Sequence, residues 1–361
     1  MIAKPVVEPA ERRRIKRVGL GLAAVLVVDG AGLAGSIARL PVPAYEQVRS
    51  AYRSSYLTLL DRDGAVLERV RNDYHERRDN WTPLNEISIA LVNAVLQSED
   101  RRFYSHAGVD ILALGGAVRD RLTRNSVRGS STITMQLAGM LDADDGRNGR
   151  RTITQKARQM MQALAMELHW SKSQILEAYL NLVPWRGELS GISAAARSLF
   201  GKYPVGLDSR ESAILAAMLR APNAAPAVIA RRACGILKAQ SQAQYCDHLE
   251  SITEYQLSNT GSTLQDDPFA ASHFARARLA LGMPEQANLT TTIDGRLQRT
   301  AQAIVNRVVH EIRHSHANDA AAIVLDNRSG HILAYVGSSG DLATARYVDN
   351  ARAMRQAGST L

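Results

Sequence analysis

The first residues that could do chemistry are two adjacent carboxylates, Glu99 and Asp100, at the end of a segment predicted to be an apolar helix. The helix dipole disfavours a negative charge at that end, and burial of a carboxylate favours its protonated form. A group in such a position suits a general base. A solvated acidic turn is the commoner explanation for such a pair, and the residue types alone leave both interpretations open.

A second candidate site is rich in small hydroxyl side chains. It runs from Arg128 and Gly129 to Gln136, and its N–H and O–H groups could donate hydrogen bonds to a phosphate. It is not a P-loop, because no Gly-Lys-Ser/Thr sequence follows the glycine. The basic residues that come next predict either a solvated face or an anion clamp; they are Arg147, Arg150, Arg151, Lys156 and Arg158.

Helices are expected to position most of these residues. Apolar side chains recur at helical spacing between Ser88 and Ala230, which predicts a mostly α-helical domain. Two segments of alternating residues around tight turns predict β-hairpins, at 57–70 and at 321–336. The individual helices are expected at 155–170, 173–182 and 211–220, and the polar stretch 231–287 is expected to be a linker with some helix.

The composition of the 361-residue chain is typical of a globular protein with two or three domains, because 45% of residues are apolar and 22% are charged. The net charge of +9 suits an anionic membrane face or a phosphate-bearing substrate. Aromatic residues make up only 5%, which argues against a nucleic-acid partner bound by stacking. The two cysteines exclude a disulfide framework and a four-cysteine zinc site; Cys234 and Cys246 form either one disulfide or two buried thiols.

The N-terminus has the features of a single-pass membrane anchor. A basic cluster at 12–17 precedes an apolar segment at 18–38, which is long enough to span a bilayer as a helix. The basic flank predicts a cytoplasmic N-terminus and translocation of everything after Arg39. Asp29 lies within the apolar segment and is costly in a membrane. A cleaved signal peptide is the alternative.

Four ordered motifs resemble those of peptidoglycan glycosyltransferases (glycosyltransferase family 51), the lysozyme-like domain of class A penicillin-binding proteins. The resemblance extends over nearly the whole chain and is greatest to the 1C type, through the sequences at 134–139 and 180–188. It implies polymerisation of lipid II into glycan strands with release of undecaprenyl diphosphate. The motifs are Glu99 to Gly108, Gly129 to Gln136, Ile175 to Asn181 and Gly191 to Lys202.

The resemblance also implies roles for individual residues. Glu99 is the expected catalytic base, and Ser131, Thr132 and Gln136 are expected to position the substrate. No metal site is certain, although a divalent cation, Mg²⁺ or Mn²⁺, could accompany the diphosphate. The remaining expected substrate-binding residues are Asp100, His106, Thr134 and Asn181, together with a cationic clamp of Arg128, Arg151 and Lys156. Arg128 is assigned to this clamp by its position before the glycine turn and not by the resemblance.

The sequence departs from the general family pattern at three positions. Met135 replaces a usual Gln, Gly139 replaces a frequent Lys, and Gln159 stands where a second Glu is usual. All three fit the 1C type, but they put any role for a second carboxylate in doubt.

The last residues resemble the start of a transpeptidase Ser-x-x-Lys motif, with Ser359 at the position of the nucleophile. The chain ends before the lysine, so the transpeptidase part is expected to be inactive. The predicted domains are a cytoplasmic tail at 1–17, an anchor at 18–38, a juxtamembrane segment with a hairpin at 39–79, the glycosyltransferase at 80–230, a linker at 231–288 and an incomplete α+β transpeptidase start at 289–361.

Two other functions stay open on this reasoning. A lysozyme-type hydrolase would share the fold and use one glutamate as its acid. An inactive remnant would only bind peptidoglycan or a partner. The expected location is the bacterial plasma membrane with the catalytic domain on the periplasmic side, and the expected partners are lipid II, the growing glycan strand, the membrane and other cell-wall synthesis proteins.

Overall fold

The computed structural model describes residues 35–116, 131–142, 153–258, 271–281 and 288–354. The chain divides into two compact units, one formed by 1–50 with 99–179 and the other by 51–98 with 180–361. Across the described residues, no helix is both long and apolar enough to cross a membrane. Most of the predicted anchor at 18–38, and the predicted nucleophile Ser359, lie outside the described residues.

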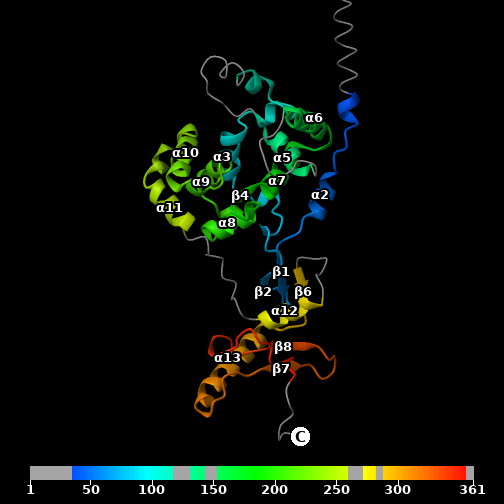
Figure 1. The fold of residues 1–361 in the computed structure, drawn as a ribbon, viewed down its shortest axis with the longest axis vertical. Helices are drawn as coiled ribbons and strands as arrows, with labels where there is room; N and C mark the ends of the chain where they lie inside the picture. The colour runs from blue at the N-terminus through cyan, green and yellow to red at the C-terminus, as the bar shows by residue number, and fades with distance from the viewer. Residues whose placement is uncertain (1–34, 117–130, 143–152, 259–270, 282–287, 355–361) are drawn as a thin grey trace, which may run out of the picture. The chain divides into compact units, whose positions relative to one another are not determined.

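The first unit is helical, and α5 and α6 lie against each other in it (Figure 1). Helix α5 begins where the side chain of Thr132 accepts a hydrogen bond from the backbone N–H of Met135, at 3.1 Å, which caps its N-terminus. The expected helices at 155–170 and 173–182 are confirmed as α6 and α7. The elements are α2 (Tyr45–Ala51), α5 (Ile133–Leu141), α6 (Ile153–His169) and α7 (Lys172–Leu182); Ala51 and the last three residues of α7 belong to the other unit.

The second unit contains a cluster of helices, of which α9 is nearly fully buried. The α9 N-terminus carries a reciprocal capping box between Asp208 and Glu211, which satisfies two backbone N–H groups. Helix α10 packs against both α9 and α11. These helices are α3 (Ile89–Glu99, ending at the first residue of the other unit), α8 (Ile192–Phe200), α9 (Ser209–Met218), α10 (Pro226–Ala239) and α11 (Leu249–Ser258).

The stretch 231–287, expected to be a linker with some helix, is more helical than expected in its described part. Helices α10, α11 and α12 (Ser272–Ala280) occupy most of its described part. A disulfide joins Cys234 of α10 to Cys246, with their Cα atoms 5.1 Å apart. Buried apolar residues such as Leu237 and Leu249 explain the difference, because a few spaced core contacts hold helices whose other faces are polar.

The predicted hairpin at 57–70 is confirmed by strands β1 (Tyr56–Leu60) and β2 (Val66–Arg71), which pair antiparallel. The structure adds a distant strand, β6 (Asn288–Thr290), parallel to β1. A second small sheet has the order β3-β5-β4. Its strands are β3 (Arg77–Arg78), β4 (Pro184–Arg186) and β5 (Leu189–Ser190).

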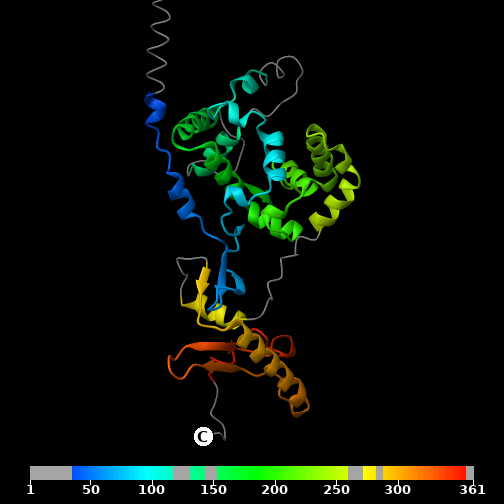
Figure 2. The same ribbon diagram turned by 180° about the vertical axis from the view of Figure 1, so that it is seen from behind.

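The second predicted hairpin is confirmed by β7 (Ala322–Leu325) and β8 (Ile332–Val336), and it does not stand alone. Helix α13 (Gly295–Ile312) lies along one face of this hairpin, as both ribbon views show (Figure 2). The buried Gln298 side chain donates to the Tyr335 carbonyl at 2.9 Å and accepts from its N–H at 2.7 Å. The helix therefore covers an apolar face of the hairpin and also forms two hydrogen bonds with its backbone.

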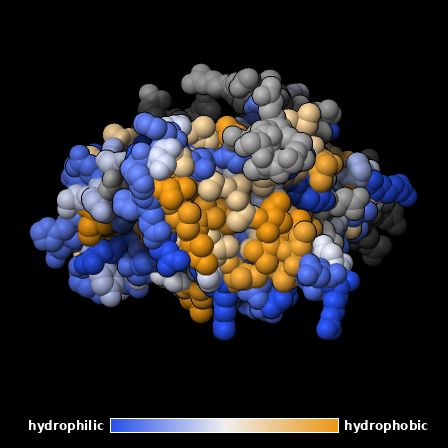
Figure 3. Space-filling model, turned by 90° about the horizontal axis from the view of Figure 1, so that it is seen from below, coloured by the Kyte–Doolittle hydropathy of each residue, from blue (hydrophilic) through white to orange (hydrophobic). Residues whose placement is uncertain are grey.

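The side of the molecule with α13, β7 and β8 also carries exposed apolar side chains. Figure 3 shows an apolar area gathered on the face seen from this side. Such areas are uncommon on soluble monomers. The exposed large apolar residues of α13 and β7 are Ile304, Val308, Ile312, Ile323 and Leu325.

Candidate active site

Three side chains from three helices form a hydrogen-bonded series that ends at Glu99, the last residue of α3; the other two are Gln136 and Tyr179. Gln136 of α5 donates from its amide Nε2 to Glu99 Oε2 at 3.1 Å. Tyr179 of α7 donates from its hydroxyl to Gln136 Oε1, also at 3.1 Å. Glu99 itself is half-buried, so part of this residue is open to solvent.

The phenol at the end of this series decides how the amide is oriented. Burial, followed by the negative charges of Glu99 and Asp100, raises the pKa of Tyr179 well above its usual value, so the phenol keeps its proton and acts as a donor. An amide that accepts from Tyr179 through its oxygen must present its NH₂ group to Glu99. Tyr179 therefore holds Gln136 in the orientation that fixes the Glu99 carboxylate.

Asp100 faces the protein interior and is buried. Its carboxylate lies 2.9 and 3.0 Å from His106 Nε2 and accepts a hydrogen bond from the backbone N–H of Ile133 at 3.1 Å. The carbonyl of His106 in turn accepts from Lys172 Nζ at 2.7 Å. Asp100 and His106, predicted to bind substrate, thus connect the segment after Glu99 to the first turn of α5.

The threonine hydroxyls predicted to contact substrate are engaged within the protein. Thr132 Oγ1 donates to the carbonyl of Gly108 at 2.5 Å, and Thr134 Oγ1 donates to Glu167 Oε1 at 2.7 Å. Both residues are buried. Lys172 Nζ also donates to Glu167 Oε1, at 2.7 Å. These two hydroxyls therefore stabilise the fold around α5, and the substrate contacts expected of Thr132 and Thr134 stay a prediction.

Gly108 shows why the motif after Glu99 contains a glycine. Its φ of +87° lies in the left-handed region, and a Cβ atom there would be 2.6 Å from the carbonyl oxygen of Ala163. Only glycine lets this turn approach α6 so closely.

Asn181 also has an internal role, in the second unit. It is buried, accepts from the backbone N–H of Thr82 and donates to the carbonyl of Thr82, both at 2.8 Å. This paired contact satisfies both polar groups of one peptide segment. The substrate-binding role expected of Asn181 stays a prediction.

The predicted cationic clamp is described only in part. Lys156 lies half-buried on α6, and Ser131 lies half-buried just before the cap residue Thr132, whereas Arg128 and Arg151 fall outside the described residues. Among the described residues, no three His, Cys, Asp or Glu side chains are grouped to hold a metal ion. A divalent cation at the diphosphate stays a prediction.

The three positions that depart from the family pattern are all buried. Met135 and Gly139 lie on α5 and Gln159 lies on α6. An apolar side chain, a glycine and an uncharged amide can be buried at lower cost than the charged residues that are usual at two of these positions.

The sequence-based assignment missed the roles of Tyr179, Glu167 and Lys172. All three are ordinary in a helical pattern, and a buried tyrosine at helical spacing is typical of a core residue. Only the pairing of Tyr179 with Gln136, 43 positions earlier, reveals its part in orienting Glu99.

The comparisons with known proteins agree on one family. The transglycosylase family model matches residues 63–241. Penicillin-binding protein 2D of Bacillus subtilis is 29% identical over 83% of this chain and 44% of its own length, and penicillin-binding protein 1C of Escherichia coli is 30% identical over 77% of this chain and 36% of its own length. The chain thus spans less than half the length of these two relatives.

A shorter relative is matched over more of its length. The biosynthetic peptidoglycan transglycosylase of Thiobacillus denitrificans is 34% identical over 44% of this chain and 68% of its own length. The segment that the family model matches, 63–241, contains Glu99, Gln136 and Tyr179. On these grounds the chain belongs to the transglycosylase family.

Proposed function

We propose that this chain is a peptidoglycan glycosyltransferase that polymerises lipid II into glycan strands and releases undecaprenyl diphosphate. The observation that carries the proposal is the Tyr179–Gln136–Glu99 chain of hydrogen bonds within a segment of the transglycosylase family. A carboxylate that is oriented by a fixed amide donor, in a residue partly open to solvent, is suited to accept a proton from a bound hydroxyl.

The reaction is a displacement at one carbon. Glu99 accepts the proton of the 4-hydroxyl group of the acceptor GlcNAc as that oxygen forms a bond to the anomeric carbon of the donor MurNAc. The bond between that carbon and the diphosphate oxygen breaks, and the leaving diphosphate takes the electron pair. Attack from the face opposite the leaving group inverts the anomeric configuration.

The leaving group needs positive charge and hydrogen-bond donors in place before the bond breaks. Lys156 on α6 is the described cation assigned to this role, since α6 packs against the helix that carries Gln136. Arg128 and Arg151 are proposed to act with it, and Ser131 to donate from its hydroxyl.

The membrane location is part of the same proposal. The basic cluster at 12–17 and the apolar segment at 18–38 support a single-pass anchor in the plasma membrane with the catalytic part on the periplasmic side. An anchored enzyme meets a lipid-linked substrate in the plane of the membrane. Other cell-wall synthesis proteins are proposed partners, and the segment after 289, with Ser359, is proposed to belong to a transpeptidase-type fold.

The test is the variant Glu99→Gln, assayed with labelled lipid II and, separately, with preformed glycan. Loss of the general base should lower the polymerisation rate by about two to four orders of magnitude with an unchanged circular dichroism spectrum. The matched control is Glu86→Gln, the same change at an exposed glutamate outside the site, which should retain the rate. Near-native synthesis by Glu99→Gln would overturn the mechanism.

The same assay separates the other functions. Breakdown of preformed glycan would show a hydrolase. Absence of both polymer and breakdown in the unmodified protein would show a remnant that only binds.

A further inference from the structure

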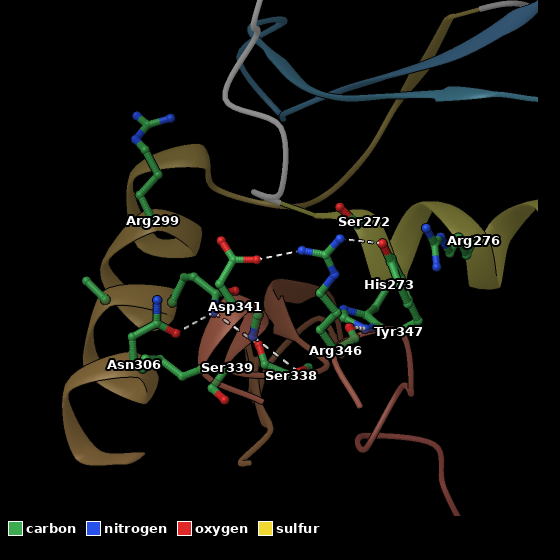
Figure 4. Close-up of a pocket in the computed structure, with 14 residues that line it drawn as sticks. Ser272, His273, Arg276, Arg299, Asn306, Ser338, Ser339, Asp341, Arg346 and Tyr347 are labelled. Atoms are coloured by element: carbon green, nitrogen blue, oxygen red, sulfur yellow. Dashed lines mark hydrogen bonds and ion pairs between the residues drawn. The ribbon is translucent and has the colours of Figure 1, made fainter. Parts of the chain in front are cut away.

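A pocket of about 400 Å³ lies in the second unit. Its lining residues are far from Glu99 in sequence and have no role in the proposed reaction. Its walls come from α12, from α13 and from the turn that follows β8 (Figure 4). A volume of this size is in the range of pockets that hold small organic ligands.

The pocket carries an excess of positive charge. Its lining includes three arginines, Arg276 of α12, Arg299 of α13 and Arg346 after β8, against a single carboxylate, Asp341. Arg346 pairs with Asp341 at 2.7 Å. In the described part of the chain Arg276 and Arg299 form no ion pair, although the charge of Arg276 acts on the buried Glu68 carboxylate, so neither guanidinium group is held by a direct carboxylate contact.

An aromatic ring holds two of these guanidinium groups in place. The guanidinium carbons of Arg276 and Arg346 lie 4.9 and 4.7 Å from the centroid of the Tyr347 ring, and Arg346 Nη2 donates to the Tyr347 hydroxyl at 2.5 Å. Figure 4 shows the Asp341, Arg346 and Tyr347 side chains joined in one row across the pocket. Guanidinium groups placed before binding lose less conformational entropy when a ligand arrives.

The backbone around the pocket is also held firmly. His273 Nε2 donates to the carbonyl of Arg346 at 3.0 Å. The Asp319 carboxylate accepts hydrogen bonds from the hydroxyl and N–H of Ser339, at 2.8 and 2.7 Å, and from the hydroxyl of Ser338 at 2.9 Å. These contacts fix the turn that carries Asp341 relative to the helices.

We propose that this pocket binds a small organic anion through a carboxylate or phosphate group. Arg276 supplies the main ionic contact, Arg299 adds charge at the rim, and Tyr347 offers an apolar wall for the body of the ligand. Planar guanidinium groups suit both carboxylates and phosphates, because either can accept two parallel N–H bonds. The inference does not depend on the proposed glycosyltransferase activity.

The test is calorimetric titration of the full chain with two probes, inorganic phosphate and the dipeptide Ala-Glu. The dipeptide acetyl-Ala-Gln-NH₂, blocked at both ends, serves as the uncharged comparison. We expect saturable binding of at least one anionic probe and none of the uncharged one. Binding of Ala-Glu alone identifies a carboxylate ligand, and binding of phosphate alone identifies a phosphate ligand.

Variants localise the binding. Arg276→Gln should weaken it about tenfold to a hundredfold, in keeping with one charged hydrogen bond, and Arg276→Gln with Arg299→Gln should weaken it further. Arg307→Gln is the matched control, because it removes the same charge from exposed α13 surface outside the pocket. Equal weakening by Arg307→Gln, unchanged binding in the double variant, or no saturable binding of either probe would overturn the proposal. Lipid II polymerisation by Arg276→Gln should match that of the unmodified protein.

Discussion

At the scale of single residues, the orientation of Glu99 depends on a hydroxyl that never touches it. Tyr179 reaches Glu99 only through the Gln136 amide, and each of the two contacts is 3.1 Å long. A group that acts through another is a positioning residue, and its loss should lower the rate without abolishing it.

Tyr179→Phe should therefore lower kcat about fivefold to tenfold, in keeping with one neutral hydrogen bond, and leave KM nearly unchanged. The measurement is steady-state polymerisation of lipid II. Tyr45→Phe is the matched control, because the Tyr45 hydroxyl donates to Glu177 and not to Gln136. In a Gln136→Leu background, Tyr179→Phe should have no further effect on kcat, since the group it orients is gone. An additive loss would show that Tyr179 acts by another route.

Asp100 illustrates a carboxylate whose contacts point inward. It accepts from the Ile133 N–H and pairs with His106, and it is buried. Asp100→Asn keeps the shape of the side chain but removes the negative charge that accepts these hydrogen bonds. The free energy of unfolding should therefore fall by about 2 to 3 kcal/mol. Urea unfolding measures this, with the exposed Asp63→Asn as the control. Unchanged stability with lost polymerisation would mean that Asp100 binds substrate instead.

At the scale of elements, a buried carboxylate connects β2 to the start of α12. Glu68 Oε2 accepts from the Ser272 hydroxyl at 3.0 Å and faces the backbone N–H of Ala271. Burial raises the pKa of Glu68 from 4.5 to about 7, although the hydrogen bonds from Ser272, Ala271 and Arg69 and the charge of Arg276 oppose this rise. The folded protein therefore binds this proton more tightly than the unfolded chain does.

The raised pKa of Glu68 determines the direction in which the free energy of unfolding changes with pH. The stabilisation from protonated Glu68 is complete below about pH 4.5, where the unfolded chain is also protonated, and is lost as the pH rises towards 7. Glu68→Gln removes this titration. Comparing urea unfolding of the two proteins at pH 5 and pH 7.5 should show that the variant loses less stability on going to the higher pH. Parallel changes in both proteins would contradict the assignment.

At the scale of the whole molecule, the disulfide between Cys234 and Cys246 bears on the compartment in which the chain folds. Disulfides persist mainly in oxidising compartments, which agrees with the proposed periplasmic side. Thiol labelling of the unreduced, denatured protein should find no free thiol. Two labelled thiols would contradict both the bridge and the location it supports.

The bridge should also stabilise the fold. It joins α10 to the turn before α11 and closes a short loop, with a sequence separation of 12. The double variant Cys234→Ser and Cys246→Ser should lower the free energy of unfolding by about 2 to 3 kcal/mol, mainly because the unfolded chain gains freedom. Reduction of the unmodified protein should produce the same loss, which controls for the serine substitutions.

Local patterns in the sequence were sufficient for several of the regular elements. Helices α6, α7 and α9 follow the spacing of their apolar residues, and the hairpins β1–β2 and β7–β8 follow alternation around tight turns. The candidate base Glu99 was also found from local motifs. The reason is that helix periodicity and turn chemistry depend on neighbours within a few residues.

Only the tertiary structure decided which polar residues face inward. Thr132, Thr134 and Asn181 belong to the same motifs as Glu99, yet their polar groups bond to Gly108, Glu167 and Thr82. The pairing of β6 with β1 and the contact of Tyr179 with Gln136 likewise join segments far apart in sequence. The partner of a side chain depends on the path of the whole chain. Packing among distant elements determines that path, and the local spacing of residues does not contain this information.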